Sequence, residues 1–339
     1  MRQPTARHPM TTRPNPFVSL QAGAVDALPP GPRFEPADHL WSRPEIDALT
    51  LALAARRPLL VRGEAGSGKS QLARAAAKQL DSGQPWVAVI HPRFEALDLL
   101  YRFDAVARLS DAQLRGADGQ ALLDLGNRKY LSQGALWRAL LAAKPDAPLP
   151  VLLIDEIDKA DADVPNALLD VLGNRSFEVP YLPEGQRIVQ GTAGAMPLIV
   201  ITTNEERELP AAFVRRCVVL NLNPPEGEAA FIDWLIERGR AHARLADVHI
   251  KVARQAAAQV WADRQVAAGA GYPKVGLAEF IDLLTALDEL TASAPPAQRS
   301  RQQARWLQRL SAYALVKHAK QDQARPAVSA GHGSSTTDD

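Results

Sequence analysis

The stretch PLLVRGEAGSGKSQLARAAAKQL, residues 58–80, connects a short apolar run to a helical pattern through a glycine-rich turn. Within the turn, Gly63, Gly68, Lys69 and Ser70 fill the pattern G-x-x-x-x-G-K-S. Glycines let successive backbone N–H groups point inward, and the N-terminus of the following helix adds a partial positive charge. A strand before the pattern and a helix after it are the context that confirms a phosphate-binding loop.

This loop predicts a site for ATP and Mg²⁺. Lys69 is expected to reach the β and γ phosphates, and the hydroxyl of Ser70 is expected to ligate Mg²⁺. The residues expected to bind the nucleotide are Gly63, Glu64, Ala65, Gly66, Ser67, Gly68, Lys69, Ser70 and Gln71.

Four further apolar runs have the length of buried strands: WVAVI (86–90), VLLID (151–155), PLIVIT (197–202) and VVLNL (218–222). Strands that are apolar on both faces belong in a parallel sheet covered on both sides. Helical stretches such as ALWRALLAA and VPNALLDVL separate these runs. We therefore expect an α/β core over residues 37–224, with a central parallel five-stranded sheet flanked by helices.

The rest of the chain has a different character. From residue 225 to 321 the strand signals stop and helix-period segments follow, among them EGEAAFIDWLIERGRAHARL and GLAEFIDLLTALDEL, which predict a small all-α domain. Residues 1–36 are rich in Pro, Arg and Thr and predict a flexible N-terminal arm. Residues 322–339 predict a disordered tail.

Composition excludes several classes of protein. Of the 339 residues, 46% are hydrophobic and 23% charged, which suffices for a sizeable core. The 39 Lys and Arg nearly balance the 38 Asp and Glu, so nothing general attracts nucleic acid or an anionic membrane. The single cysteine, Cys217, is expected to be a small buried hydrophobe. No apolar run approaches the roughly 18 residues of a membrane span, and we expect a cytoplasmic protein.

The run VLLIDEID ends in two carboxylates, Asp155 and Glu156. The carboxyl ends of parallel strands face the ligand, so Asp155 is expected beside the Mg²⁺ held by Ser70. Glu156 can then deprotonate the attacking water. The alternative for this pair is a solvated acidic strand end. For Asp158 and Lys159, an exposed ion pair is at least as well supported as a catalytic role.

The next strand, LIVITTN, ends in Asn204, whose amide could position the attacking water, although Asn at such a place is often only a turn residue. Arg215 and Arg216 follow ELPAAFV. Two adjacent guanidinium groups repel each other unless an anion faces them, and a γ-phosphate in a neighbouring subunit would be such an anion. A surface pair bonded to local carboxylates is the alternative.

With a phosphate loop at 63–70, an acidic strand at 151–156, Asn204 as sensor 1 and a paired-arginine segment LPAAFVRRC, the chain resembles an AAA+ ATPase. Within that superfamily it resembles the MoxR group. Support comes from DEIDKA, from LPAAFVRRC, and from ALLDVLGNRSFEVP followed by QRIV. SFEVP and QRIV resemble the two strands of the hairpin before sensor 1, with YLPEG as its turn. HPRFEALDLLYRFDAVARL lies where the group carries its helix-2 insert.

The resemblance implies a P-loop AAA+ core followed by a helical lid that carries sensor 2. In this group sensor 2 usually lies in a segment like R-K-P-P-G-T. Here the corresponding segment is GYPKVGLAEFIDLL, and its only cation is Lys274. The role is therefore assigned to Lys274.

The resemblance further implies a Mg²⁺-dependent ATPase that forms a homo-hexameric ring and remodels a protein client, possibly one with a von Willebrand A domain. Asn204, Glu156, Lys274 and an arginine finger, Arg215 or Arg216, would carry catalysis. Two alternatives are a nucleic-acid-linked motor and an ATP-gated scaffold. A nucleic-acid partner is not expected, because no basic, aromatic-bearing pore or DNA-binding module is visible.

Overall fold

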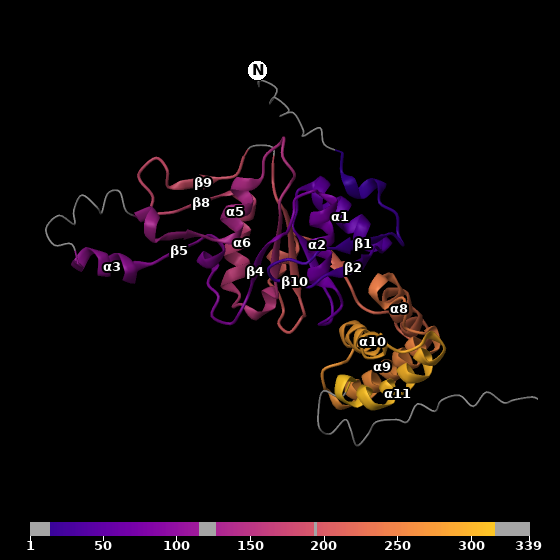
Figure 1. Ribbon diagram of the computed structural model, residues 1–339. Coiled ribbons are helices and arrows are strands. Elements are labelled where there is room, and N and C mark those ends of the chain that lie inside the picture. Colours follow the sequence, from indigo (N-terminus) through magenta and orange to yellow (C-terminus); the bar gives the residue numbers. More distant parts are fainter. Residues whose placement is uncertain (1–13, 115–126, 193–194, 316–339) are drawn as a thin grey trace, which may run out of the picture. The chain divides into compact units, whose positions relative to one another are not determined.

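The structure, a computed structural model, describes residues 14–114, 127–192 and 195–315 (Figure 1). The chain forms two compact units. Of the described residues, the first combines those up to Ala24, in Trp41–Gly63 and in Lys69–Asn221, and the second combines those in Val25–Leu40, in Glu64–Gly68 and from Leu222 onward.

A five-stranded parallel sheet forms the centre of the first unit. Its strands stand in the order β11-β3-β10-β7-β4, and every neighbouring pair is parallel. Their bounds are β3 Leu59–Arg62, β4 Trp86–Val89, β7 Val151–Asp155, β10 Leu198–Thr203 and β11 Val218–Asn221. All five strands fall on the five apolar runs of the sequence, so the predicted sheet is confirmed.

Helices cover both faces of this sheet. In Figure 1, α1 (Arg43–Ala55) and α2 (Lys69–Gln79) lie on one side, and α5 (Ala135–Ala142) and α6 (Asp163–Asn174) lie on the other. The first four residues of β7 are buried, because alternate side chains of the strand pack against each helical layer. The cluster on the side of α5 and α6 includes Leu60, Leu136, Leu140, Leu152, Ile154, Leu168, Val171 and Ile199.

Two antiparallel hairpins extend the first unit. Strands β8 (Ser176–Glu178) and β9 (Ile188–Gln190) pair as the predicted hairpin, which is confirmed. A second hairpin, β5 (Tyr101–Phe103) and β6 (Leu131–Gln133), was not expected from the sequence. The rings of Phe103 and Tyr181 stack with centroids 3.8 Å apart and so connect the two hairpins. Short elements complete this region: η2 Ala96–Leu99, α3 Ala105–Leu114 and η4 Asn127–Tyr130.

The second unit is helical, with one hairpin. Its helices are α8 Glu228–Ala241, η6 Ala243–Leu245, α9 Ile250–Ala270, α10 Leu277–Thr291 and α11 Pro296–Leu315. Phe231, Leu235, Val260, Phe280 and Leu287 form the centre of its core and are fully buried. The hairpin consists of β1 (Val25–Leu28) and β2 (Ala37–Leu40), paired antiparallel. Among the residues that the structure describes, no helix is long and apolar enough to cross a membrane.

Cys217 is buried, as its apolar context predicted. The thiol lies 3.4 Å from the carbonyl oxygen of Phe213, to which it donates a hydrogen bond. Burial raises the pKa of this thiol to about 11, so the reactive thiolate form is scarce at neutral pH.

The predicted N-terminal arm is wrong for residues 14–36. Pro16–Ser19 form the 3-10 helix η1, and Phe17 is fully buried, its ring 6.2 Å from that of the buried Trp41. Two backbone hydrogen bonds join Gly23 and Ala24 to Trp41. One buried aromatic ring can dock a segment that lacks any apolar periodicity, and composition does not reveal this. Residues 1–13 and the predicted tail, 322–339, lie outside the described residues.

We expect Phe17→Ala to lower the free energy of unfolding by about 3–5 kcal/mol, because a fully buried ring is removed and a cavity remains. Denaturant unfolding followed by tryptophan fluorescence would measure the change. The neighbouring Val18, 71% exposed, supplies the control, and Val18→Ala should stay within about 0.5 kcal/mol of the parent chain. Equal small effects for both variants would show that Phe17 does not anchor this segment.

Candidate functional site

The phosphate-loop sequence adopts a backbone that requires glycine. Gly63, Gly66 and Gly68 have φ values of 153°, 73° and 94°, which side chains other than that of glycine rarely allow. Lys69 begins α2, is buried, and its Nζ donates to the carbonyl oxygen of Gly63 over 2.7 Å. The ammonium group therefore points toward Gly63 and away from bulk water.

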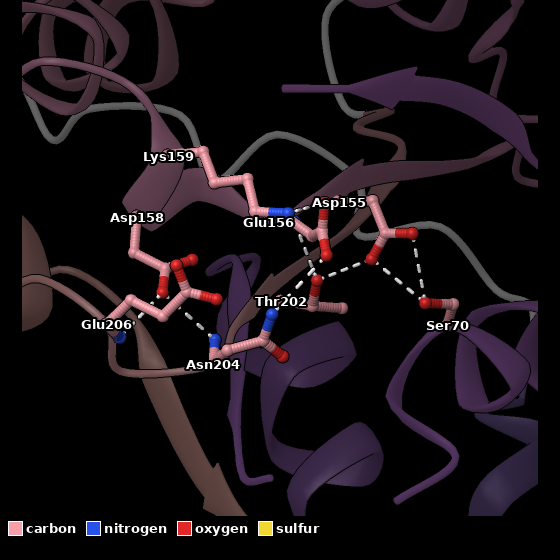
Figure 2. Close-up of polar contacts among 8 residues, drawn as sticks. All are labelled: Ser70, Asp155, Glu156, Asp158, Lys159, Thr202, Asn204 and Glu206. Carbon is pink, nitrogen blue, oxygen red and sulfur yellow. Dashed lines mark hydrogen bonds and ion pairs between the residues drawn. The ribbon is translucent and has the colours of Figure 1, made fainter. Parts of the chain in front are cut away.

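Three segments meet at Asp155, at the end of β7 (Figure 2). The hydroxyl of Ser70, in the first turn of α2, donates to this carboxylate, with distances of 2.9 and 3.0 Å to its two oxygens. The hydroxyl of Thr202, near the end of β10, donates to Oδ1 over 2.5 Å. The sheet register explains why Thr202 meets Asp155, because Ile201 pairs with Ile154 and so places the next residues of both strands side by side.

Glu156 lies in a left-handed backbone conformation, with φ at 61° and ψ at 49°. Such a conformation is uncommon for a residue with a Cβ atom and costs about 1–3 kcal/mol unless its surroundings hold it. Here the backbone N–H of Glu156 donates to the hydroxyl of Thr202 over 2.9 Å. The carboxylates of Asp155 and Glu156 bond to different groups (Figure 2).

Two donors hold the carboxylate of Glu156. Nζ of Lys159 lies 2.8 Å from Oε2, and Nδ2 of Asn204 lies 3.3 Å from Oε1. The hydrogen bond to Glu156 raises the pKa of Lys159, so the cation persists beside the carboxylate. Both side chains of the pair are about one-third exposed, which leaves Glu156 accessible to water. Asn204 and Glu156, expected to act together, are thus in contact.

Of the two alternatives left open for Asp158 and Lys159, the exposed ion pair is not observed. Asp158 lies on the 3-10 turn η5 (Ile157–Lys159) and is only 1% exposed. Its Oδ2 accepts the backbone N–H groups of Asn204 and Glu206 over 3.2 and 2.9 Å. Lys159 points to Glu156 instead (Figure 2).

Arg215 and Arg216 follow the short helix α7 (Ala211–Val214), and both are exposed. Among the described residues, neither guanidinium group forms an ion pair with a carboxylate. Arg215 lines a cavity of about 480 Å³ together with Arg62, Thr203, Glu205 and Arg207. The alternative of a surface pair neutralised by local carboxylates is therefore not observed.

In the second unit, Glu64 of the glycine loop is paired with two cations. Nη2 of Arg264, on α9, lies 2.6 Å from one carboxylate oxygen, while Nζ of Lys274 lies 3.6 Å from the other. Arg264 is buried and also donates to the carbonyl oxygen of Val275 over 3.1 Å. The sequence motif predicted only Lys274 for the role of sensor 2, because Arg264 lies outside the motif segment GYPKVGLAEFIDLL. Arg264 is one of two arginines in the alanine-rich run VARQAAAQVWADRQVA, and nothing in that run distinguishes it from Arg254.

The residues present suit a magnesium nucleotide. The hydroxyl of Ser67 is buried and has no hydrogen-bond partner among the described residues, as expected of a donor reserved for a ligand. A Cβ atom on Gly68 would meet nothing within 4 Å, so there is open space beside this residue. Hydroxyl and carboxylate oxygens, as on Ser70 and Asp155, are ligands that Mg²⁺ prefers.

Comparison with known proteins agrees with this geometry. Residues 42–182 match the family model described as an AAA ATPase domain. Together with the observed fold, this match supports an AAA+ ATPase. No curated protein matches the chain.

Several solved structures are similar to the chain, each at low identity. NtrX from Brucella abortus in complex with ADP has 16% identity and a TM-score of 0.42 over 76% of this chain and 52% of that one. The same protein in complex with ATP has 16% identity and a TM-score of 0.41 over 75% and 53%. A RuvB variant from Thermotoga maritima has 18% identity and a TM-score of 0.41 over 80% and 70%. The chain thus spans about half the length of the NtrX structures that it matches.

Thr202 is a site residue that sequence reasoning missed, and it is fully buried. We expect Thr202→Val to lower the free energy of unfolding by about 1–3 kcal/mol, because the partly buried N–H of Glu156 loses its acceptor. Thr285→Val is the control: its partly buried hydroxyl donates to the carbonyl oxygen of Ile281 within α10 and accepts no hydrogen bond among the described residues, so its loss leaves no donor without an acceptor. Equal losses in denaturant unfolding would contradict a special role for Thr202.

Proposed function

We propose that this chain is a Mg²⁺-dependent ATPase that hydrolyses ATP to ADP and phosphate. The observation that carries the proposal is the meeting of Ser70, Asp155, Thr202, Glu156 and Asn204 at the carboxyl ends of β7 and β10, directly after a glycine-rich loop. Ligands of open α/β sheets bind at this edge.

Each residue has a distinct role in this proposal. Lys69 and the loop N–H groups hold the phosphates, and Ser70 and Asp155 would hold Mg²⁺. When bound, the ion neutralises negative charge that develops on the phosphate oxygens. Glu156 accepts a proton from the water whose oxygen attacks the γ-phosphorus, while the bond to the β–γ bridging oxygen breaks. Asn204, which donates to the carboxylate of Glu156, orients that water.

We further propose that the chain acts as a ring of the MoxR type, a hexamer, with Arg215 or Arg216 reaching the γ-phosphate of the neighbouring subunit. The exposure of both side chains and the absence of a carboxylate partner for either among the described residues support this assignment. Lys274 is proposed as sensor 2. The work done would be chaperone-like remodelling of a client protein in the cytoplasm, possibly one with a von Willebrand A domain.

Lys69→Ala should abolish nucleotide binding, since it removes the ammonium group that faces the phosphates. Glu156→Gln should bind nucleotide normally and lose turnover, because only proton acceptance is removed. Titration with a fluorescent nucleotide and a phosphate-release assay measure the two properties. Lys78→Ala, an exposed lysine in the last turn of the same helix, is the control and should change neither. An equal loss of binding in Lys69→Ala and Glu156→Gln would contradict this division of roles.

The finger arginines are expected to act across a subunit interface. Both Arg215→Ala and Arg216→Ala should bind ATP normally. The variant that removes the finger should lose turnover by about 10³-fold or more. Arg207→Ala, an exposed arginine that lines the same cavity, should keep normal turnover.

Mixing the inactive finger variant with Lys69→Ala should restore partial activity, because some interfaces then combine an intact Lys69 with an intact finger. If mixed rings form and every ratio stays inactive, the shared site is wrong or the finger lies elsewhere, for example at Arg175 or Arg187. Adding DNA to the same assay tests the nucleic-acid-linked motor, which requires stimulation by DNA. Absence of turnover with intact ATP binding would favour the ATP-gated scaffold.

A further inference from the structure

We propose that Asp158 is a positioning residue for ATP hydrolysis, whose buried carboxylate holds the backbone turn that presents Asn204 to Glu156. This inference rests on the proposed ATPase function. Neither the family match nor the sequence motifs assign this role to Asp158.

The turn after β10 depends on side chains for its hydrogen bonds. The N–H groups of Asn204 and Glu206 both donate to Oδ2 of Asp158, over 3.2 and 2.9 Å. The N–H of Glu205, between them, donates to the hydroxyl of Thr203 over 2.9 Å. All three consecutive amides of the turn are therefore bound by the side chains of buried residues, Asp158 and Thr203.

The backbone of this turn is also unusual. Glu205 has φ at 61°, in the left-handed region that residues with a Cβ atom rarely adopt. The chain bends around the carboxylate of Asp158 at this residue, so the amides on both sides of Glu205 reach the same oxygen (Figure 2). A strained bend of this kind persists only where the surroundings hold it.

Asp158 has no other bonding role among the described residues. It forms no ion pair there, and its second oxygen, Oδ1, is buried without a hydrogen-bond partner. Burial of a carboxylate is costly unless its hydrogen bonds compensate. A carboxylate placed under the Asn204 turn, and bonded to that turn alone, is best explained by the need to fix the turn.

By holding the turn after β10, Asp158 also holds the side chain of Asn204 beside the carboxylate of Glu156. Nδ2 of Asn204 lies 3.3 Å from Oε1 of Glu156, and Nζ of Lys159, the residue after Asp158, lies 2.8 Å from Oε2. The short turn η5 thus sets both neighbours of the Glu156 carboxylate: Lys159 directly and Asn204 through Asp158. Displacement of a catalytic group by about 1 Å can cost about 10²-fold in rate.

The test is a double-mutant cycle in the full chain, with kcat and KM for ATP measured for each variant. Asp158→Ala removes the acceptor and should lower kcat by about 10-fold to 10²-fold, with KM within about 3-fold of the parent chain. Asp158→Asn keeps an oxygen for both N–H groups and should retain kcat within about 3-fold. Asp158→Ala combined with Asn204→Ala should be no slower than Asn204→Ala alone, within about 3-fold, because both changes remove the same contribution.

Amide hydrogen exchange supplies a readout besides activity. The amides of Asn204 and Glu206 should exchange faster in Asp158→Ala and at the parent rate in Asp158→Asn. Glu45→Gln is the matched control: this buried carboxylate of the first unit accepts the N–H of Ser42 at the cap of α1, and its loss should leave kcat unchanged. If Asp158→Ala does not fold, Asp158→Ser replaces it with the same expected results, since a hydroxyl cannot reach both N–H groups.

Three results would overturn the inference: unchanged kcat in Asp158→Ala, a rise in KM alone, or rate losses that multiply in the double variant. A failure of the proposed ATPase function would give a different result. The parent chain would then show no ATP turnover that depends on Lys69, whatever the exchange rates of the amides of Asn204 and Glu206.

Discussion

The rest of the site depends on the hydrogen bonds that the carboxylate of Asp155 accepts. It accepts hydrogen bonds from Ser70 and Thr202, which come from a helix and a strand far from β7 in sequence. These bonds are possible because parallel strands end at a common edge and the register pairs Ile201 with Ile154. A half-buried carboxylate is stabilised by such donors. The same hydrogen bonds hold the oxygen atoms of the proposed metal site in place.

Thr202 extends this arrangement to the next residue of the chain. Its hydroxyl donates to Asp155 and accepts the N–H of Glu156, so one buried side chain connects the proposed metal ligand to the proposed base. Glu156 itself has a left-handed backbone conformation. The carboxylate of Asp155 meets hydroxyl groups, whereas that of Glu156 meets an ammonium group and an amide. Two adjacent acidic residues thereby acquire different environments and can have different roles.

Much of the fold and part of the site could be predicted from the sequence. Five apolar runs gave the five strands, since strands buried on both faces need continuous apolar residues. The hairpin 176–190 was recognisable by resemblance, whereas the β5–β6 hairpin has no distinctive pattern. The interpretation of residues 14–36 as an arm failed at Phe17, because docking by one ring leaves no periodic signal. The sequence left the role of Asp158 open, because burial of a charged residue is decided by its neighbours in space.

The sequence by itself determined the phosphate loop, the order of strands and helices along the chain, and which residue types end each strand. These features depend on local backbone preferences and hydrophobic spacing, which a single segment carries. Only the tertiary structure decided that Thr202 bridges Asp155 and Glu156, that Lys159 contacts Glu156, and that Asp158 bonds the turn at Asn204. Those contacts join Asp155–Lys159 to one another and to residues more than 40 positions away. Hydrogen bonds between such distant residues are set by strand register and burial, which no local sequence pattern encodes.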